Sequence, residues 1–137
     1  MIRKEVFPQP RLIGVDAWLP YLEAEPCKCY DELIWADLFD VVRGKLDICF
    51  DCVLCMDVIE HLDKKEGRVL SDWLLKQPLA YLSTPLFPFR QGAVDGNRYE
   101  CHLSYYDLPE LVEMGWKPIV KVQWDGTDRW MGAFKNA

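Results

Sequence analysis

Long apolar runs, clusters of basic residues and an export signal are all missing from this sequence of 137 residues. No run approaches the roughly 20 apolar residues that a membrane-spanning helix needs, and the first residues do not lead into a signal-peptide core. The 16 basic residues are scattered among 22 acidic ones, which leaves a net charge of −6. Because such a surface repels phosphate backbones, a nucleic-acid partner is disfavoured. We expect a soluble, cytoplasmic protein with no membrane contact.

The six cysteines lack the arrangement of a disulfide framework or a zinc site. Without an export signal, they are expected to be reduced thiols. Cys49, Cys52 and Cys55 fall in a predicted strand, where residues three apart point to opposite faces, so they do not form one ligand set. The other three cysteines could join a site only through long-range proximity. We therefore expect no metal.

The apolar residues are sufficient for one compact domain over residues 1–137, since 50% of the chain is hydrophobic. Strands are predicted over 11–16, 33–36, 48–59 and 79–83, and helices over 17–25, 64–77 and 107–115. The run 48–59 is nearly continuous, which is typical of a central parallel strand with both faces buried. The runs 119–124 and 130–134 flank Asp125-Gly126-Thr127-Asp128 and predict a hairpin. The expected fold is α/β, with a mostly parallel sheet that ends in an antiparallel hairpin.

Carboxylates stand at the carboxyl ends of three of the predicted strands, at Asp16, Asp37 and Asp57. In an open α/β sheet, ligands bind beyond the carboxyl ends of the strands. Asp16 is as consistent with a helix cap as with a ribose ligand, and Asp37 taken alone favours a turn. The pair Glu60-His61 is more often a hydrogen-bonding element at a helix entry than a general base.

Short motifs with these residues recur in order along the chain. They are Ile13-Gly14-Val15-Asp16-Ala17-Trp18, Pro20-Tyr21-Leu22, Tyr30-Asp31-Glu32, Ala36-Asp37, Phe50-Asp51-Cys52-Val53, Asp57-Val58-Ile59-Glu60-His61-Leu62, Glu66-Gly67 and Ser83-Thr84-Pro85. Together they resemble the successive motifs of class I S-adenosylmethionine-dependent methyltransferases over about residues 11–115. The predicted long loop 86–103 and the residues just after it add Gln91, Gly96-Asn97, Tyr99-Glu100, His102 and Ser104, similar to a subset of that family.

The resemblance implies a Rossmann-like methyltransferase fold, S-adenosylmethionine as cofactor and a small-molecule or sugar-like methyl acceptor. It implies that Asp16 holds the ribose hydroxyls, that Trp18 lies against the adenine face and that Asp37 meets the adenine amine. Cys55 and Asp57 would line the methionine side of the cofactor. His61, Gln91, Asn97 and His102 would face the acceptor, and the two histidines are the candidate catalytic residues.

The sequence departs from that family at its start, because the first strand and the GxGxG-type cofactor loop are absent. Gly14 is the only glycine before Gly44, so the chain resembles a methyltransferase truncated at its N-terminus. The first strand of the family lies centrally in the sheet, so its loss would leave two unpaired strand edges. Ile2 to Phe7 could form a substitute strand, within a segment 1–10 that is otherwise disordered. Alternatively, the flanking strands pair directly or a second copy supplies the edge. We expect rearrangement with a homodimer.

Three functions are open on this basis. The retained Asp16 and Asp37 favour an enzyme that transfers methyl groups from S-adenosylmethionine. The missing glycine loop favours a non-catalytic, truncated methyltransferase-fold protein that acts as a binding or dimerisation module. In the third case the chain is a fragment of a longer protein, to which the activity belongs.

Overall fold

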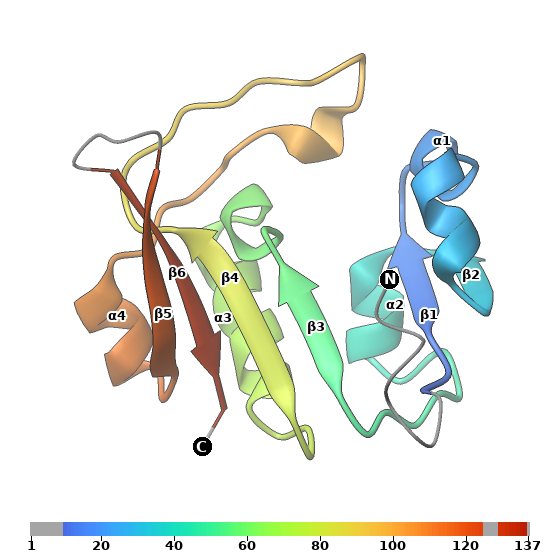
Figure 1. Ribbon diagram of the computed structural model, residues 1–137, viewed down its shortest axis with the longest axis horizontal. Coiled ribbons are helices and arrows are strands. Elements are labelled where there is room, and N and C mark those ends of the chain that lie inside the picture. Colours follow the sequence, from blue (N-terminus) through green and yellow to red (C-terminus); the bar gives the residue numbers. More distant parts are fainter. Residues whose placement is uncertain (1–9, 125–128, 137) are drawn as a thin grey trace. The chain divides into compact units, whose positions relative to one another are not determined.

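The computed structural model describes residues 10–124 and 129–136, in two compact units that comprise residues 1–46 and 47–137 (Figure 1). Each unit is described by itself below, and the single domain predicted for the whole chain stays a prediction. The proposed substitute strand Ile2–Phe7 and the predicted turn 125–128 lie outside the described residues.

The first unit contains two short parallel strands, β1 (Ile13–Asp16) and β2 (Glu32–Trp35). Two short helical segments connect them, namely α1 (Leu19–Leu22) and the 3-10 helix η1 (Glu25–Cys29). The predicted helix 17–25 is therefore shorter than expected. Trp18 has extended backbone angles, so α1 begins after it, with a proline in its first turn, where the missing amide proton costs nothing.

Helix α2 (Leu38–Val42) follows β2 and was not predicted from the sequence. It begins at Asp37, whose side chain accepts a hydrogen bond from the Phe39 amide. With five residues it is too short to show a hydrophobic period, so the cap is its main sequence signal.

The second unit is built on a four-stranded mixed sheet in the order β3-β4-β6-β5. Its strands are β3 (Val53–Met56), β4 (Ala80–Pro85), β5 (Lys117–Trp124) and β6 (Arg129–Lys135). Strands β3 and β4 are parallel, whereas β6 runs antiparallel to both β4 and β5. This sheet confirms the predicted combination of parallel strands with a closing antiparallel hairpin (Figure 1).

The prediction of a central, doubly buried strand over 48–59 is wrong. Only Val53–Met56 is a strand, and β3 stands at the end of its sheet in the described part of the chain. Its side chains alternate: Cys55 is buried, whereas Leu54 and Met56 are 65% and 50% exposed. A strand with a neighbour on one side and packing on one face exposes its other face, even when the sequence is apolar throughout.

Two capped helices complete the second unit, and they confirm the helices predicted over 64–77 and 107–115. Asp63 caps α3 (Lys64–Leu74) and Asp107 caps α4 (Leu108–Glu113), each by accepting a hydrogen bond from the amide three residues on. Gly115 follows α4 with a φ of +109°, which is the conformation expected at a helix end. The core contains side chains from these helices and from the sheet, namely Leu70, Leu74, Leu82, Leu111, Trp116 and Phe134.

The strand pairings bear on how the sheet accommodates the missing first strand. Among the described residues, β1 pairs with β2 in the first unit and β3 pairs with β4 in the second, and direct pairing of the two flanking strands stays a prediction. A second copy as the source of the missing edge stays a prediction. In the described part of the chain, no helix has the length and apolar character needed to cross a membrane.

Candidate functional site

A cavity of about 310 Å³ opens beyond the carboxyl ends of β3 and β4 in the second unit. Its polar lining comprises Asp57, Glu60, His61, Gln91, Glu100 and His102. Pro85, Phe87, Phe89 and Met131 form its apolar lining. Four residues that the sequence analysis selected, Asp57, His61, Gln91 and His102, are therefore brought together, although they span 46 positions of the chain.

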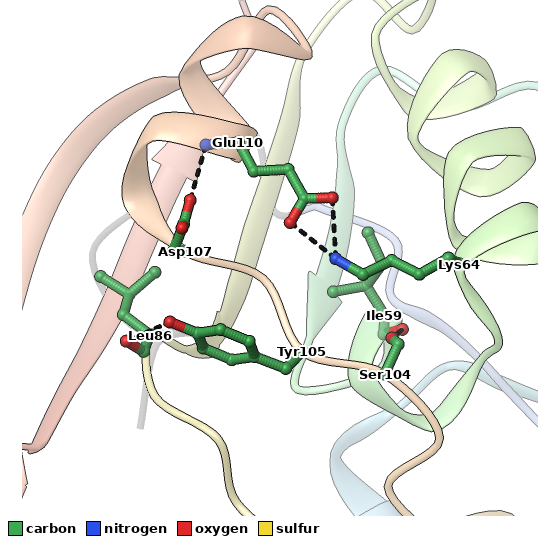
Figure 2. A network of polar contacts seen from close by, with 7 residues as sticks. All are labelled: Ile59, Lys64, Leu86, Ser104, Tyr105, Asp107 and Glu110. Atoms are coloured by element: carbon green, nitrogen blue, oxygen red, sulfur yellow. Dashed lines mark hydrogen bonds and ion pairs between the residues drawn. The ribbon is translucent and has the colours of Figure 1, made fainter.

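Main-chain hydrogen bonds hold the end of the long loop beside the 3-10 helix η2 (Ile59–His61). The amides of Leu103 and Ser104 both donate to the carbonyl of Glu60, at 2.8 and 3.1 Å. The Ser104 hydroxyl donates to the carbonyl of Ile59 at 3.3 Å, as Figure 2 shows. These contacts place His102 beside His61, with ring centroids 4.8 Å apart and planes at 76°.

Further polar contacts extend this attachment on the far side of Ser104 (Figure 2). The Tyr105 hydroxyl donates to the carbonyl of Leu86, at 3.5 Å, and Leu86 directly follows β4. The ammonium of Lys64, at the start of α3, contacts both carboxylate oxygens of Glu110, at 2.7 and 2.6 Å. The segment after His102 is thus fixed to η2, to the residue that follows β4 and, through Glu110 of α4, to α3.

Both histidines direct Nδ1 at a backbone carbonyl. His61 Nδ1 lies 3.3 Å from the carbonyl oxygen of Cys101, and His102 Nδ1 lies 2.7 Å from that of Phe89. Since a carbonyl only accepts, Nδ1 must carry the proton, and in the neutral ring Nε2 then has a lone pair. Burial lowers the pKa of His102, which favours that neutral ring.

Glu60 is a buried carboxylate at the cavity, only 3% exposed. Its side chain accepts a hydrogen bond from the Thr84 hydroxyl at 3.1 Å. Burial raises the pKa of Glu60 to about 7. Sequence reasoning noted Glu60 only as a neighbour of His61, and its position directly after the apolar run 48–59 was the signal available.

Asp57 is held in a sparsely populated backbone conformation, with a φ of +53°. The Ser83 hydroxyl donates to its carboxylate at 2.7 Å, and the Asp57 amide donates to Ser83 Oγ at 3.1 Å. Strained backbone of this kind is common at functional sites, where the surrounding structure fixes a side chain in place.

Cys55 and Asn97, two further predicted site residues, are buried away from this lining. Cys55 is 6% exposed, and burial raises the pKa of its thiol to about 12. Asn97 is 1% exposed and caps the 3-10 helix η3 (Arg98–Glu100) by accepting from the Tyr99 amide at 3.0 Å. Gln91, in contrast, donates to the Glu100 carbonyl at 2.9 Å and lines the cavity.

The predicted cofactor residues Asp16, Trp18 and Asp37 belong to the first unit. The carboxylates of Asp16 and Asp37 each accept an amide hydrogen bond from two residues on, at 2.7 Å. Asp37 thereby caps α2, whereas α1 begins after Trp18 and has no side-chain cap. Asp16 ends β1 and Asp37 follows β2, and because these strands are parallel both lie at the same edge. Sequence reasoning missed Trp35, which pairs in register with Asp16 and is 66% exposed. Its place at the carboxyl end of the predicted strand 33–36, directly before Ala36-Asp37, was the available signal.

Neither a protein-family model nor a curated protein sequence matches the chain. Solved structures do. The N-methyltransferase NodS from Bradyrhizobium japonicum WM9 has a TM-score of 0.56 at 16% identity, with 92% of this chain and 73% of NodS covered. The N-terminal domain of EvdMO1, solved in the presence of SAH and D-fucose, has a TM-score of 0.59 at 17% identity, covering 94% and 66% of the two chains.

A third neighbour, the small RNA methyltransferase HEN1, has a TM-score of 0.53 at 14% identity, with 90% of this chain and 20% of HEN1 covered. The chain thus spans less than two thirds of HEN1 and just under that share of the EvdMO1 domain. The order and direction of the strands within each unit agree with this likeness. This chain has the fold of the class I S-adenosylmethionine-dependent methyltransferases.

Proposed function

We propose that this protein transfers a methyl group from S-adenosylmethionine to a small-molecule or sugar-like acceptor. The observation that carries this proposal is the cavity at the carboxyl ends of β3 and β4, where two histidines and three carboxylates converge in a chain of methyltransferase fold. The acidic net charge of −6 supports a small acceptor over a nucleic acid. A cytoplasmic location is part of the same proposal.

The first unit offers groups that suit a nucleoside. One carboxylate oxygen of Asp16 accepts the hydrogen bond from the Trp18 amide. The carboxylate can still accept hydrogen bonds from ribose hydroxyls. The exposed indole of Trp35 stands opposite Asp16 in the strand register and could stack on a base. In this proposal Trp18 lies against the adenine face and Asp37 accepts from its amine. Cys55 and Asp57 are proposed for the methionine side.

When bound, the cofactor supplies an electrophilic methyl group for direct displacement by the acceptor. The residues of the cavity orient the acceptor and take up its proton. Nε2 of His61 or His102 is the base, because the carbonyl contact of Nδ1 leaves Nε2 unprotonated in the neutral ring. Gln91 lines the acceptor side of the cavity, and Asn97 shapes its loop through the cap on η3.

A second candidate function is a non-catalytic binding or dimerisation module, alone or as a fragment of a longer protein. The sequence favours it through the missing glycine-rich loop, whose backbone amides would approach the cofactor. The exposed side chains Leu54 and Met56 on the outermost strand β3 support a homodimer in either case.

Calorimetric titration with S-adenosylhomocysteine tests the proposal. The wild-type chain is expected to bind in the micromolar range, and Asp16→Ala is expected to abolish binding. Asp16→Asn keeps an oxygen for the Trp18 amide but removes the charge, so a loss of roughly 10- to 100-fold in affinity is expected without loss of the fold. Asp51→Asn, an exposed acid elsewhere, is the matched control. No heat at millimolar ligand would make catalysis by this chain untenable and would favour the second function.

A further inference from the structure

We propose that Glu60, His61 and His102 form a binding site for one divalent first-row transition-metal cation. One ligand atom from each of the three residues lies within 4.8 Å of the others. Metal–ligand bonds of roughly 2.1 Å place ligands about 3 to 3.4 Å apart, so binding needs the most distant pair to approach by about 1.4 to 1.8 Å. The sequence analysis weighed only thiols as metal ligands, whereas these three residues bring imidazole and carboxylate donors together from two separate segments.

The histidines are oriented as metal-binding histidines are. A ligating histidine characteristically donates its second ring N–H to a backbone carbonyl or carboxylate, which fixes the tautomer and the ring plane. His61 makes this contact with the carbonyl of Cys101, and His102 makes it with that of Phe89. Both Nε2 atoms are therefore the donors left for a cation.

The ring of His102 is also held by packing. It lies edge to face against Phe89, with centroids 5.0 Å apart and planes at 87°, and edge to face against His61. Since the main-chain bonds from Leu103 and Ser104 to Glu60 fix the loop as well, the donors are ordered before any cation arrives. Such preorganisation lowers the cost of binding.

Glu60 supplies a buried carboxyl group as the third ligand. Its side chain is 3% exposed and bonds to a neutral hydroxyl, that of Thr84. No lysine or arginine of the described chain forms an ion pair with it. A buried carboxylate is normally paired with a cation or coordinates a metal, and here the two neighbouring imidazoles provide the remaining ligands.

The wider cavity has the same electrostatic character. Asp57 and Glu100 line it together with Glu60, and its described lining contains neither lysine nor arginine. Two imidazole nitrogens with one carboxylate on one side of a metal leave open positions for water or a polar ligand. This donor set suits manganese, iron, cobalt, nickel or zinc better than calcium, which takes oxygen ligands throughout.

The site stands on the geometry of the cavity and is independent of the proposed methyl transfer. On the proposed methyl transfer, the cation would bind both Nε2 atoms and would activate a hydroxyl of the acceptor in place of a histidine base.

Manganese is the probe for the test, because the exposed thiols of Cys29, Cys49 and Cys52 would compete for zinc or copper. Metal-free full-length protein is titrated with MnCl₂, and free Mn²⁺ is counted by its electron paramagnetic resonance signal. One Mn²⁺ per chain is expected. His61→Ala, His102→Ala and Glu60→Gln are each expected to weaken binding by roughly tenfold or more, as loss of even a supporting residue does at metal sites. Glu113→Gln, which removes one exposed carboxylate on α4, is expected to bind as the wild type does.

A measurement on the wild type keeps the test decisive if a variant does not fold. Pulsed paramagnetic resonance of bound Mn²⁺ is expected to show coupling to imidazole nitrogens, since the chain has only two histidines and both are proposed ligands. Absence of that coupling, no binding up to millimolar Mn²⁺, or equal affinity of the folded histidine variants would overturn the site. Because the readout involves no cofactor, the metal site and the methyl transfer can fail separately.

Discussion

Cys55 and Cys49 stand six residues apart and have opposite surroundings. Cys55 is buried, with a pKa raised by burial to about 12, whereas Cys49 is exposed. Only the thiolate reacts with alkylating reagents, so burial protects Cys55 both sterically and electrostatically.

We expect iodoacetamide at pH 8 to modify Cys49 in the folded protein and to reach Cys55 only after unfolding in urea. Peptide mapping by mass spectrometry measures both rates, with the exposed Cys29 as an internal reference. Equal modification of Cys55 and Cys49 in the native protein would contradict the burial of β3 on its inner face.

Residues whose roles depend on near neighbours in the sequence were the most predictable. Asp63 and Asp107 act within three positions, so their capping roles could be predicted. The meeting of His61 with His102 could not be derived in this way, because main-chain bonds from the loop to Glu60 create it. Only the resemblance to a family placed both histidines on the acceptor side.

At the scale of elements, Gly67 on α3 lies against Tyr106, which follows the long loop. A Cβ at position 67 would stand 2.0 Å from the Tyr106 hydroxyl oxygen and 3.1 Å from the ring carbon that carries it. That hydroxyl is buried and, among the described residues, has no hydrogen-bond partner. Position 67 is therefore a glycine, despite its low helix propensity, because a side chain there would clash with Tyr106.

Gly67→Ala is expected to lower the free energy of unfolding by about 1 to 3 kcal/mol, because the overpacking outweighs the gain in helix propensity. Tyr106→Phe removes the clashing oxygen, so the double variant is expected to recover part of the loss. Urea unfolding measures all three proteins. Gly92→Ala, where a Cβ would meet nothing within 4 Å, is the control and is expected to change little. A double variant no more stable than Gly67→Ala would place the clash elsewhere.

Most helices and strands were predicted with the correct type, but their exposure to solvent was predicted less well. The hairpin of β5 and β6 and the helices α3 and α4 follow from local patterns and were confirmed. The exposure of β3 was not predictable, because an apolar run looks the same in a central strand and in an outer strand. Which strands stand beside it is a property of the sheet and not of the segment.

At the scale of the whole molecule, the outer strand β3 is the region where a second copy is proposed to pair. Leu54 and Met56 expose apolar surface on the outermost strand of the sheet, and such strands invite pairing with another chain. One chain has a mass of 16.0 kDa, so dimerisation is measured directly by sedimentation equilibrium.

We expect the wild type to sediment with twice the mass of one chain, and Leu54→Lys to sediment as a monomer, because a charge on an outer strand opposes pairing. Val69→Lys places the same charge on an exposed position of α3, 46% exposed, and is expected to remain dimeric. A monomeric wild type at high concentration would remove the homodimer from the proposal.

The bond from the Leu103 amide to the Glu60 carbonyl holds the loop through main-chain atoms alone. The Leu103 side chain is 63% exposed, so its identity can change while that bond persists. Position 103 is therefore a suitable place for a fluorescent or spin label, one residue from His102. A reporter there would register ligand entry into the cavity without altering any of the groups that line it.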